Sequence, residues 1–112
     1  MVVIIKSKRR FNVYVIALDN AILNKLKFRE KNPNYIEGKP CVYVGMTGKS
    51  PDERFKQHKA GYKASKYPQN FGLYLRRKLF EKLNPMTYEE AKSMEGRLAK
   101  KLQKKGYGVW WN

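Results

Sequence analysis

Two short segments near the start of the chain are rich in β-branched and aromatic residues. The first, FNVYVIAL over Phe11–Leu18, places apolar residues on both faces of a strand with a period of two. The second, PCVYVG over Pro40–Gly45, has the same character. We predict a strand for each segment. Met1–Lys6 indicates either a further edge strand or, together with the basic run at 6–10, a mobile arm.

The insert at about 19–40, between the two strands, is polar at its ends. Asp19-Asn20 can cap a short helix that continues to about Glu30. The residues after Glu30 include Asn-Pro-Asn and Glu-Gly-Lys-Pro, which are typical of loops. The insert is therefore expected to hold one short helix and a loop.

Capping boxes predict two longer helices in the second half of the chain. The sequence SPDE at 50–53 predicts a helix to about Ala60, and TYEE at 87–90 predicts one that Gly106 ends. Between them, apolar residues around more than half of the helical circumference predict a helix at 71–83.

These elements together predict an α+β protein. The order is strand, insert, strand and three helices, and the tail 107–112 is expected to be extended. A length of 112 residues suits one domain with one modest core, and no internal repeat or linker interrupts it. We predict a single domain over 1–112.

Charge then narrows the class of partner. The chain has 25 Lys and Arg against 9 Asp and Glu, a formal net charge of +16 that a polyanion would offset. Nucleic acid is the commonest such partner, and no segment is long and apolar enough to span a membrane. The single cysteine, Cys41, allows no internal disulfide and is most simply a small buried apolar residue. We expect a cytoplasmic or nucleoid-associated protein.

Glu95 is the carboxylate whose position is hardest to explain by helix capping. On the last helix Ala91, Met94, Leu98 and Leu102 form one apolar stripe, and Glu95 projects within it. Burying a carboxylate is costly unless it is ion-paired or bound to a metal. The sequence leaves a structural salt bridge and a functional role equally open.

Four more residues form candidate pairs. Arg54 and His58 are four positions apart on a helix, at the rim of the face that carries Phe55 and Tyr62, and together offer a phosphate-binding fork and a titratable imidazole. Tyr14 and Tyr43 lie in the two strands, where neighbouring antiparallel strands can bring side chains of one face together. Taken singly, His58 is more simply a boundary residue and each tyrosine a packing residue.

Lysines interleaved with aromatic residues form a further candidate surface. They are mostly a solvated face, but they also suit contacts to phosphates beside stacking platforms. The residues predicted to contact nucleic acid are Lys49, Lys56, Lys59, Tyr62, Lys63 and Lys66.

The order of these residues resembles that of the GIY-YIG nucleases. Val13-Tyr14-Val15 resembles the GIY element, Tyr43-Val44-Gly45 resembles YIG, and Thr47, Arg54 and His58 look like the pattern that follows. Glu95 looks like the family's metal-binding glutamate, and Asn112 like its closing asparagine. The chain departs from the family at Asn12, where Gly is common, and in the length of the 19–40 insert.

The resemblance implies a fold and a chemistry. The fold is a small antiparallel sheet of three to four strands flanked by helices, and the activity is endonucleolytic hydrolysis, most simply of DNA, with one Mg²⁺ or Mn²⁺ ion. Glu95 would be the one protein ligand of the ion, with water and phosphate completing its shell. Tyr14 would be the general base, Tyr43 or His58 would orient the attacking water or accept its proton, and Arg54 would hold the phosphate. Gly45, Thr47 and Asn112 would support them.

Two other functions fit the same sequence. The first is a non-catalytic DNA- or RNA-binding module in which Glu95 is only ion-paired. The second is a basic ribosome-associated protein, which would share the charge but would have no need of an inward carboxylate.

Overall fold

Strand β1 (Asn12–Leu18) lies inside a four-stranded sheet, and all its residues after Asn12 are buried. The computed structural model describes residues 9–112, so the predicted edge strand or arm at 1–6 lies outside the described residues. The strand order is β3-β1-β2-β4, where β2 is Cys41–Thr47, β3 is Gly72–Leu75 and β4 is Gly108–Trp110. The predicted α+β class is confirmed.

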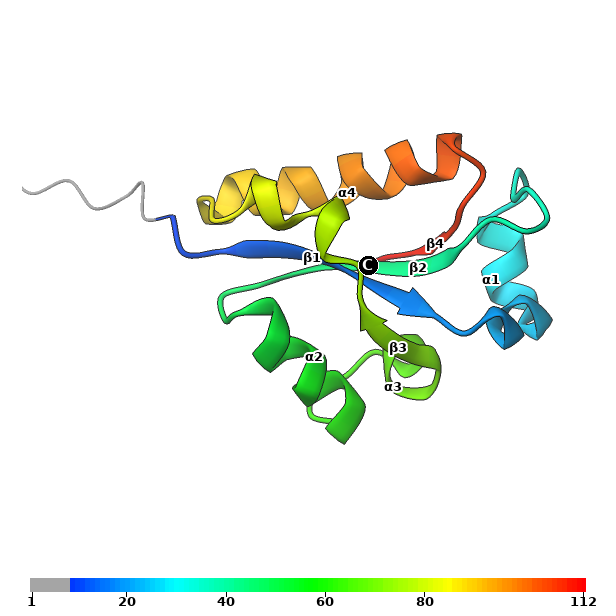
Figure 1. Cartoon of the computed structure of the whole chain (residues 1–112), viewed down its shortest axis with the longest axis horizontal. Coiled ribbons are helices and arrows are strands. Elements are labelled where there is room, and N and C mark those ends of the chain that lie inside the picture. Colours follow the sequence, from blue (N-terminus) through cyan, green and yellow to red (C-terminus); the bar gives the residue numbers. More distant parts are fainter. Residues whose placement is uncertain (1–8) are drawn as a thin grey trace, which may run out of the picture.

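The two strands expected from the sequence pair along their whole length. β1 and β2 are antiparallel, and Tyr14 lies opposite Gly45 while Ile16 lies opposite Tyr43. Both strands are apolar on both faces, so each face needs a cover of helices. Figure 1 shows that cover: helix α4 (Tyr88–Lys104) runs along one face, and α2 (Pro51–Ala60) and α3 (Lys66–Phe71) lie against the other.

The sheet is mixed, which corrects the antiparallel sheet expected from the resemblance. β4 pairs in parallel with β2, from Cys41 opposite Gly108 to Tyr43 opposite Trp110. Parallel strands need a long crossover connection, usually a helix. The helices between β2 and β4 supply that connection, with α4 last.

Both capped helices form as predicted. The Ser50 hydroxyl accepts from the Glu53 amide at the start of α2, and Thr87 and Glu90 form a complete capping box at the start of α4. The predicted helix at 71–83 is wrong. Its residues form β3 and two short 3-10 helices, Arg77–Leu79 and Glu81–Leu83.

Close packing at Gly72 explains the difference. A Cβ at Gly72 would lie 2.3 Å from the Pro68 carbonyl oxygen, so the chain makes a tight exit from α3 at this residue and continues as a strand. β3 then pairs with the exposed edge of β1, from Leu18 to Ile16. Hydrogen bonding to an unpaired strand edge outweighs the helical preference of Leu and Arg residues.

The insert at 19–40 is part of the core. It contains a 3-10 helix, Asn20–Asn24, and helix α1 (Leu26–Lys31), whose Ile22 and Phe28 are fully buried. The side-chain amide of Asn32 accepts from the Val109 amide at 2.8 Å and donates to the Val109 carbonyl at 3.0 Å. The insert therefore ties β4 to the body of the domain.

Among residues 9–112, no helix is long and apolar enough to cross a bilayer.

Candidate active site

Tyr14 and Tyr43 lie on the same face of the sheet. Because Tyr14 is paired with Gly45 and Tyr43 with Ile16, the two tyrosines are diagonal neighbours, and their ring centroids are 6.3 Å apart. Both side chains are almost wholly buried, at 1% and 2% exposed. The two rings are thus close together, as antiparallel pairing of the two strands allows.

Gly45 leaves the space that the Tyr14 ring occupies. A Cβ at Gly45 would lie 2.5 Å from both Cζ and Oη of Tyr14. A larger residue would displace the phenol, so Gly45 sets the position of the Tyr14 hydroxyl.

His58 reaches the same face from helix α2. Its Nε2 shares a hydrogen bond of 2.8 Å with the Tyr14 hydroxyl, and its ring centroid is 5.5 Å from that of Tyr43. The imidazole is 1% exposed, so it lies inside the domain and not at the rim that the helical pattern predicted. The pattern also placed Tyr62 on the buried face, but α2 ends at Ala60, Gly61 caps it, and Tyr62 is 55% exposed. Helical spacing does not predict the direction of a side chain that lies beyond the end of the helix.

Arg54 is half-buried one turn before His58. Its guanidinium donates to the carbonyl oxygens of Tyr62 at 3.1 Å and of Lys63 at 2.8 Å, which holds the turn after α2. Its charge also acts within the site, where it lowers the pKa values of Tyr14 and His58. Arg54 therefore brings a positive charge to the tyrosines while bracing the segment that carries His58.

Burial sets the protonation states of these groups. Desolvation raises the pKa of Tyr14 well above its ordinary value, and the charge of Tyr43 adds to the shift while Arg54 opposes it. Desolvation likewise raises the pKa of Tyr43. Burial, assisted by Arg54, lowers the pKa of His58 to about 4. At neutral pH the site holds two protonated phenols and a neutral imidazole. The sequence had suggested that nearby cations would lower the pKa of Tyr14, but burial has the larger effect.

One nitrogen of His58 has no hydrogen-bond partner among the described residues. Nδ1 is fully buried and unpaired, whereas Nε2 is bonded to Tyr14. A neutral imidazole that leaves one nitrogen unpaired costs less than a buried imidazolium, which would leave a charged N–H unpaired. The geometry thus agrees with the low pKa.

Glu95 lies on α4, the helix that covers the opposite face of the sheet from α2 (Figure 1). It is half-buried and projects within the apolar stripe, as predicted, because the buried Ala91, Leu98 and Ala99 lie three or four positions away on the same face of the helix. Its charge raises the pKa of Tyr43 and, to a smaller extent, that of Tyr14.

Two observations bear on what Glu95 could hold. Within residues 9–112 it takes part in no ion pair, and desolvation raises its pKa. A partly buried carboxylate left without a cation in so basic a protein suits a bound metal ion. Over the same residues no group of three or more His, Cys, Asp or Glu could bind a metal through protein ligands alone. Glu95 therefore fits an ion that keeps several waters, as Mg²⁺ does.

The supporting residues hold the ends of the strands. The side-chain amide of Asn112 donates to the Tyr43 hydroxyl at 3.2 Å. Thr47 accepts from the Lys49 amide and Asn12 donates to the Lys49 carbonyl, both at 3.0 Å, so the two residues fix the turn that leads into α2. Asn12, the departure from the usual Gly, thus has a structural role.

Asn84 is a positioning residue that the sequence did not indicate. Its amide donates to the Val13 carbonyl at 2.8 Å and accepts from the Val13 amide at 2.9 Å, which satisfies the edge of β1 next to Tyr14. A lone Asn before Pro85 is an ordinary loop signal, so nothing local revealed this contact.

A family model described as the GIY-YIG catalytic domain matches residues 30–108, which is more than half of the chain. The chain belongs to the GIY-YIG family. The matched residues include Tyr43, Arg54, His58 and Glu95, whereas Tyr14 precedes them and is placed by the structure. GIY-YIG domains are typically those of endonucleases, so nucleic acid is the class of substrate. Searches of curated proteins and of solved structures found no match.

The lysines predicted to contact nucleic acid have different surroundings in this GIY-YIG domain. Lys49, Lys56 and Lys66 are exposed, and Lys63 lies with its ammonium 5.6 Å from the ring centre of the exposed Tyr62. Lys59 differs, because its ammonium donates to the carbonyls of Gln69 at 3.0 Å and Gly72 at 2.9 Å. Lys59 joins α2 to the end of α3, and this contact competes with phosphate binding.

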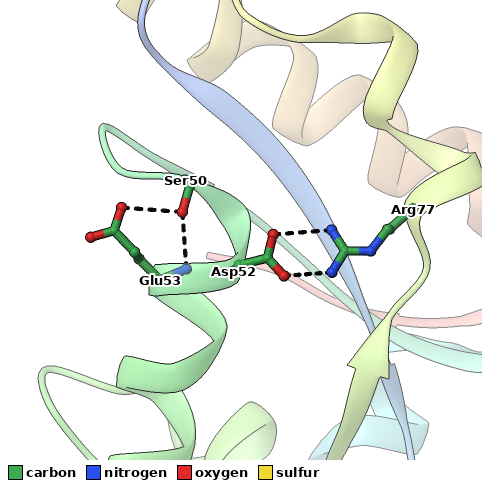
Figure 2. A network of polar contacts seen from close by, with 4 residues as sticks. All are labelled: Ser50, Asp52, Glu53 and Arg77. Atoms are coloured by element: carbon green, nitrogen blue, oxygen red, sulfur yellow. Dashed lines mark hydrogen bonds and ion pairs between the residues drawn. The ribbon is translucent and has the colours of Figure 1, made fainter.

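The start of α2 is also held from outside the helix. Figure 2 shows Asp52 paired through both oxygens with the guanidinium of Arg77, beside the cap formed by Ser50 and Glu53. The ion pair lowers the pKa of Asp52. Both partners are about half exposed, so the pair orients α2 more than it stabilises the fold.

Proposed function

We propose that this GIY-YIG chain is a divalent-metal-dependent endonuclease that hydrolyses phosphodiester bonds, with DNA preferred over RNA. The observation that carries the proposal is the 2.8 Å hydrogen bond between the Tyr14 hydroxyl and Nε2 of a neutral, buried His58. This bond gives the Tyr14 phenol a partner that can accept its proton. A DNA-cutting role also agrees with a cytoplasmic or nucleoid-associated location.

Tyr14 and His58 act together as a proton relay. The pKa of Tyr14 is too high for a standing phenolate at neutral pH. The phenol instead takes a proton from the attacking water while passing its own to Nε2 of His58. The low pKa of His58 makes this transfer unfavourable in the free protein. The negative charge of a bound phosphate favours the imidazolium and offsets part of that cost.

Arg54 and Tyr43 act on the phosphate and on the relay. Arg54 neutralises charge that builds on the phosphate oxygens, and donors of this kind are most effective in a partly dry site. The Tyr43 hydroxyl is held by Asn112 and lies beside His58, where it orients the attacking water. Each of these residues has a separate role, because they differ in charge and in whether they can donate or accept a proton.

Glu95 would hold one Mg²⁺ or Mn²⁺ ion. When bound, the ion supplies a Lewis acid that stabilises charge on the departing oxygen. Support comes from the half-buried carboxylate, which has no ion pair among the described residues, and from the effect of its charge on the pKa of Tyr43.

Glu95→Gln tests the proposal, with Glu89→Gln as the matched control. Glu89 is exposed in the first turn of the same helix. Glu95→Gln should lower Mg²⁺-dependent cleavage of labelled DNA by roughly 10³-fold, since Lewis-acid stabilisation amounts to several kcal/mol. The free energy of unfolding should change by less than about 1 kcal/mol, because the amide costs less to desolvate. Glu89→Gln should change neither property appreciably.

Each rival function predicts a different result. A binding module would bind DNA without cutting it, with or without Mg²⁺. A structural ion pair would make Glu95→Gln lose about 3–5 kcal/mol of stability, because its cation would be left buried. Unchanged cleavage by Glu95→Gln would refute the metal role, and RNA of the same sequence cut faster than DNA would refute the preference.

A further inference from the structure

A cavity opens beside the candidate active site, on the same face of the sheet. Its volume is about 440 Å³, within the range of sites that bind small molecules. It lies between the start of α1 and helix α3, and its floor includes Trp110 of β4. We call it the Trp110 pocket, and the residues that matter to the argument are Lys25, Lys27, Lys66, Tyr67, Asn70 and Trp110.

Strand pairing makes the Trp110 pocket a neighbour of the catalytic tyrosines. Trp110 lies directly beside Tyr43 in the β2–β4 ladder. Paired residues on adjacent strands point to the same face, and the strands are roughly 4.8 Å apart. Asn112, two residues after Trp110, bonds to the Tyr43 hydroxyl. A nucleotide chain with one phosphate at Tyr14 and His58 can therefore reach Trp110.

Aromatic rings form the wall of this pocket. The rings of Trp110 and Tyr67 meet edge to face with centroids 4.8 Å apart, and Phe28 stacks on Trp110 at 6.4 Å. Trp110 and Tyr67 are partly buried, whereas Phe28 is fully buried. Phe28 and the Lys31 ammonium, 4.5 Å from the Trp110 ring centre, hold the Trp110 ring in place, and the parts of Trp110 and Tyr67 that line the pocket face its open space.

The charge around the rings is positive. Three lysines line the pocket, from α1 and its cap and from α3, and no carboxylate lines it. The ammonium of Lys25 lies 6.0 Å from the ring centre of Phe71 at the pocket wall. The combination of cations with open aromatic faces is the one that proteins use for unpaired nucleotides, by stacking bases and neutralising phosphates.

We propose that the Trp110 pocket binds an unpaired nucleobase, stacked on Trp110, of the strand that is cut at the Tyr14–His58 site. This inference deepens the proposed function and rests on it. The substrate class is nucleic acid with a single-stranded segment beside the scissile phosphate. Bases inside a duplex are stacked on both faces and cannot reach a ring in a pocket, whereas an unpaired base can. Asn70 adds an amide for the edge of the base.

Trp110 itself reports on occupancy. Trp111→Phe leaves Trp110 as the only tryptophan, and Glu95→Gln with EDTA present prevents cleavage. A single-stranded oligonucleotide, and a duplex with a single-stranded tail, should quench the Trp110 fluorescence with saturation. A blunt duplex with the same number of phosphates should not. No quenching by the single strand, or equal quenching by the blunt duplex, would overturn the proposal.

A pair of lysine variants tests the same site without disturbing the aromatic packing. The double variant Lys25→Ala/Lys27→Ala should weaken binding to the single strand about tenfold or more. The slope of the logarithm of the binding constant against the logarithm of the salt concentration should become shallower by roughly 0.7 for each lysine removed. The control, Lys101→Ala/Lys105→Ala, removes the same charge from exposed positions at the end of α4. An equal loss in the control would show that only net charge matters and would refute the pocket.

The two proposals fail in different ways. If the protein binds single strands with Trp110 quenching but cuts nothing with Mg²⁺ or Mn²⁺, the endonuclease proposal fails and the base-binding pocket stands. If it cuts blunt duplexes as fast as tailed ones with Trp110 unaffected, the endonuclease proposal stands and the pocket fails.

Discussion

His58 makes the stability of the protein depend on pH through a single buried imidazole. Its pKa is about 4 in the folded protein against 6.5 in the unfolded chain, so the unfolded chain binds more protons between these values. The free energy of unfolding therefore keeps its full value above pH 6.5. As the pH falls towards 4, protonation of His58 in the unfolded chain lowers this free energy by about 3 kcal/mol. Urea unfolding of the wild type from pH 7 to 4 should show this loss.

The variant His58→Gln isolates that contribution from those of other titrating groups. Its free energy of unfolding should fall less steeply over the same range, because glutamine does not titrate. Parallel pH profiles for the wild type and His58→Gln would contradict the assignment of a depressed pKa to His58.

Gly45 provides a second prediction for a single residue. Gly45→Ala forces the Tyr14 phenol to move, because a Cβ would lie 2.5 Å from its Cζ and Oη. Cleavage should fall on the order of 10²-fold, and overpacking should cost about 1–3 kcal/mol. Gly96→Ala is the control: a Cβ there meets nothing within 4 Å, so the change should stabilise α4 slightly. Full activity of Gly45→Ala would mean that the position of the phenol is unimportant.

At the scale of secondary-structure elements, Lys59 joins α2 to α3 and β3. Its ammonium binds the Gln69 and Gly72 carbonyls, near the negative end of α3. Lys59→Met should therefore lower the free energy of unfolding by about 1–2 kcal/mol and leave the salt dependence of DNA binding nearly unchanged.

Lys56→Met on the same helix should do the reverse. Lys56 is exposed, so its loss should change the free energy of unfolding by less than about 0.5 kcal/mol. The salt dependence of DNA binding should weaken by the amount expected for the loss of roughly one phosphate contact. Urea titrations and salt titrations of both variants decide between the two roles. A loss of salt dependence in Lys59→Met would restore Lys59 as a phosphate contact.

The elements differ in how far the sequence predicted them. α2 begins with a Ser50 cap and α4 with a capping box, and the hydrogen bonds of both involve residues only three positions apart, so local sequence was sufficient. The segment 71–83 has helical periodicity but became β3 and two 3-10 helices, because the edge of β1 offered it hydrogen bonds. Helix α3 was not predicted, and its Pro68 is tolerated because it lies in the first turn, where a backbone N–H would have no partner within the helix.

At the scale of the whole molecule, the charge of +16 controls association with nucleic acid. The binding constant for duplex DNA should fall as the salt concentration rises, with an exponent of roughly −0.9 for each phosphate neutralised. With six contacts, a rise from 50 to 200 mM salt would weaken binding by on the order of 10³-fold. Fluorescence anisotropy with Glu95→Gln in EDTA measures this without cleavage, and an affinity insensitive to salt would contradict it.

Sequence alone determined the parts that depend on residue type and short spacing. These are the α+β class, the strands containing Tyr14 and Tyr43, the capped helices, and the set of residues that resembles a GIY-YIG site. Such features follow from periodicity, capping and composition, which act over a few residues.

Tertiary structure decided what depends on pairing between distant segments. The parallel alignment of β4 placed Trp110 beside Tyr43, and the insert and α3 completed the pocket over it. Burial of His58 against Tyr14, 44 positions apart in the chain, set the low pKa that no local pattern could indicate. Desolvation and strand register are properties of the packed molecule, because each depends on which surfaces meet after the chain has folded.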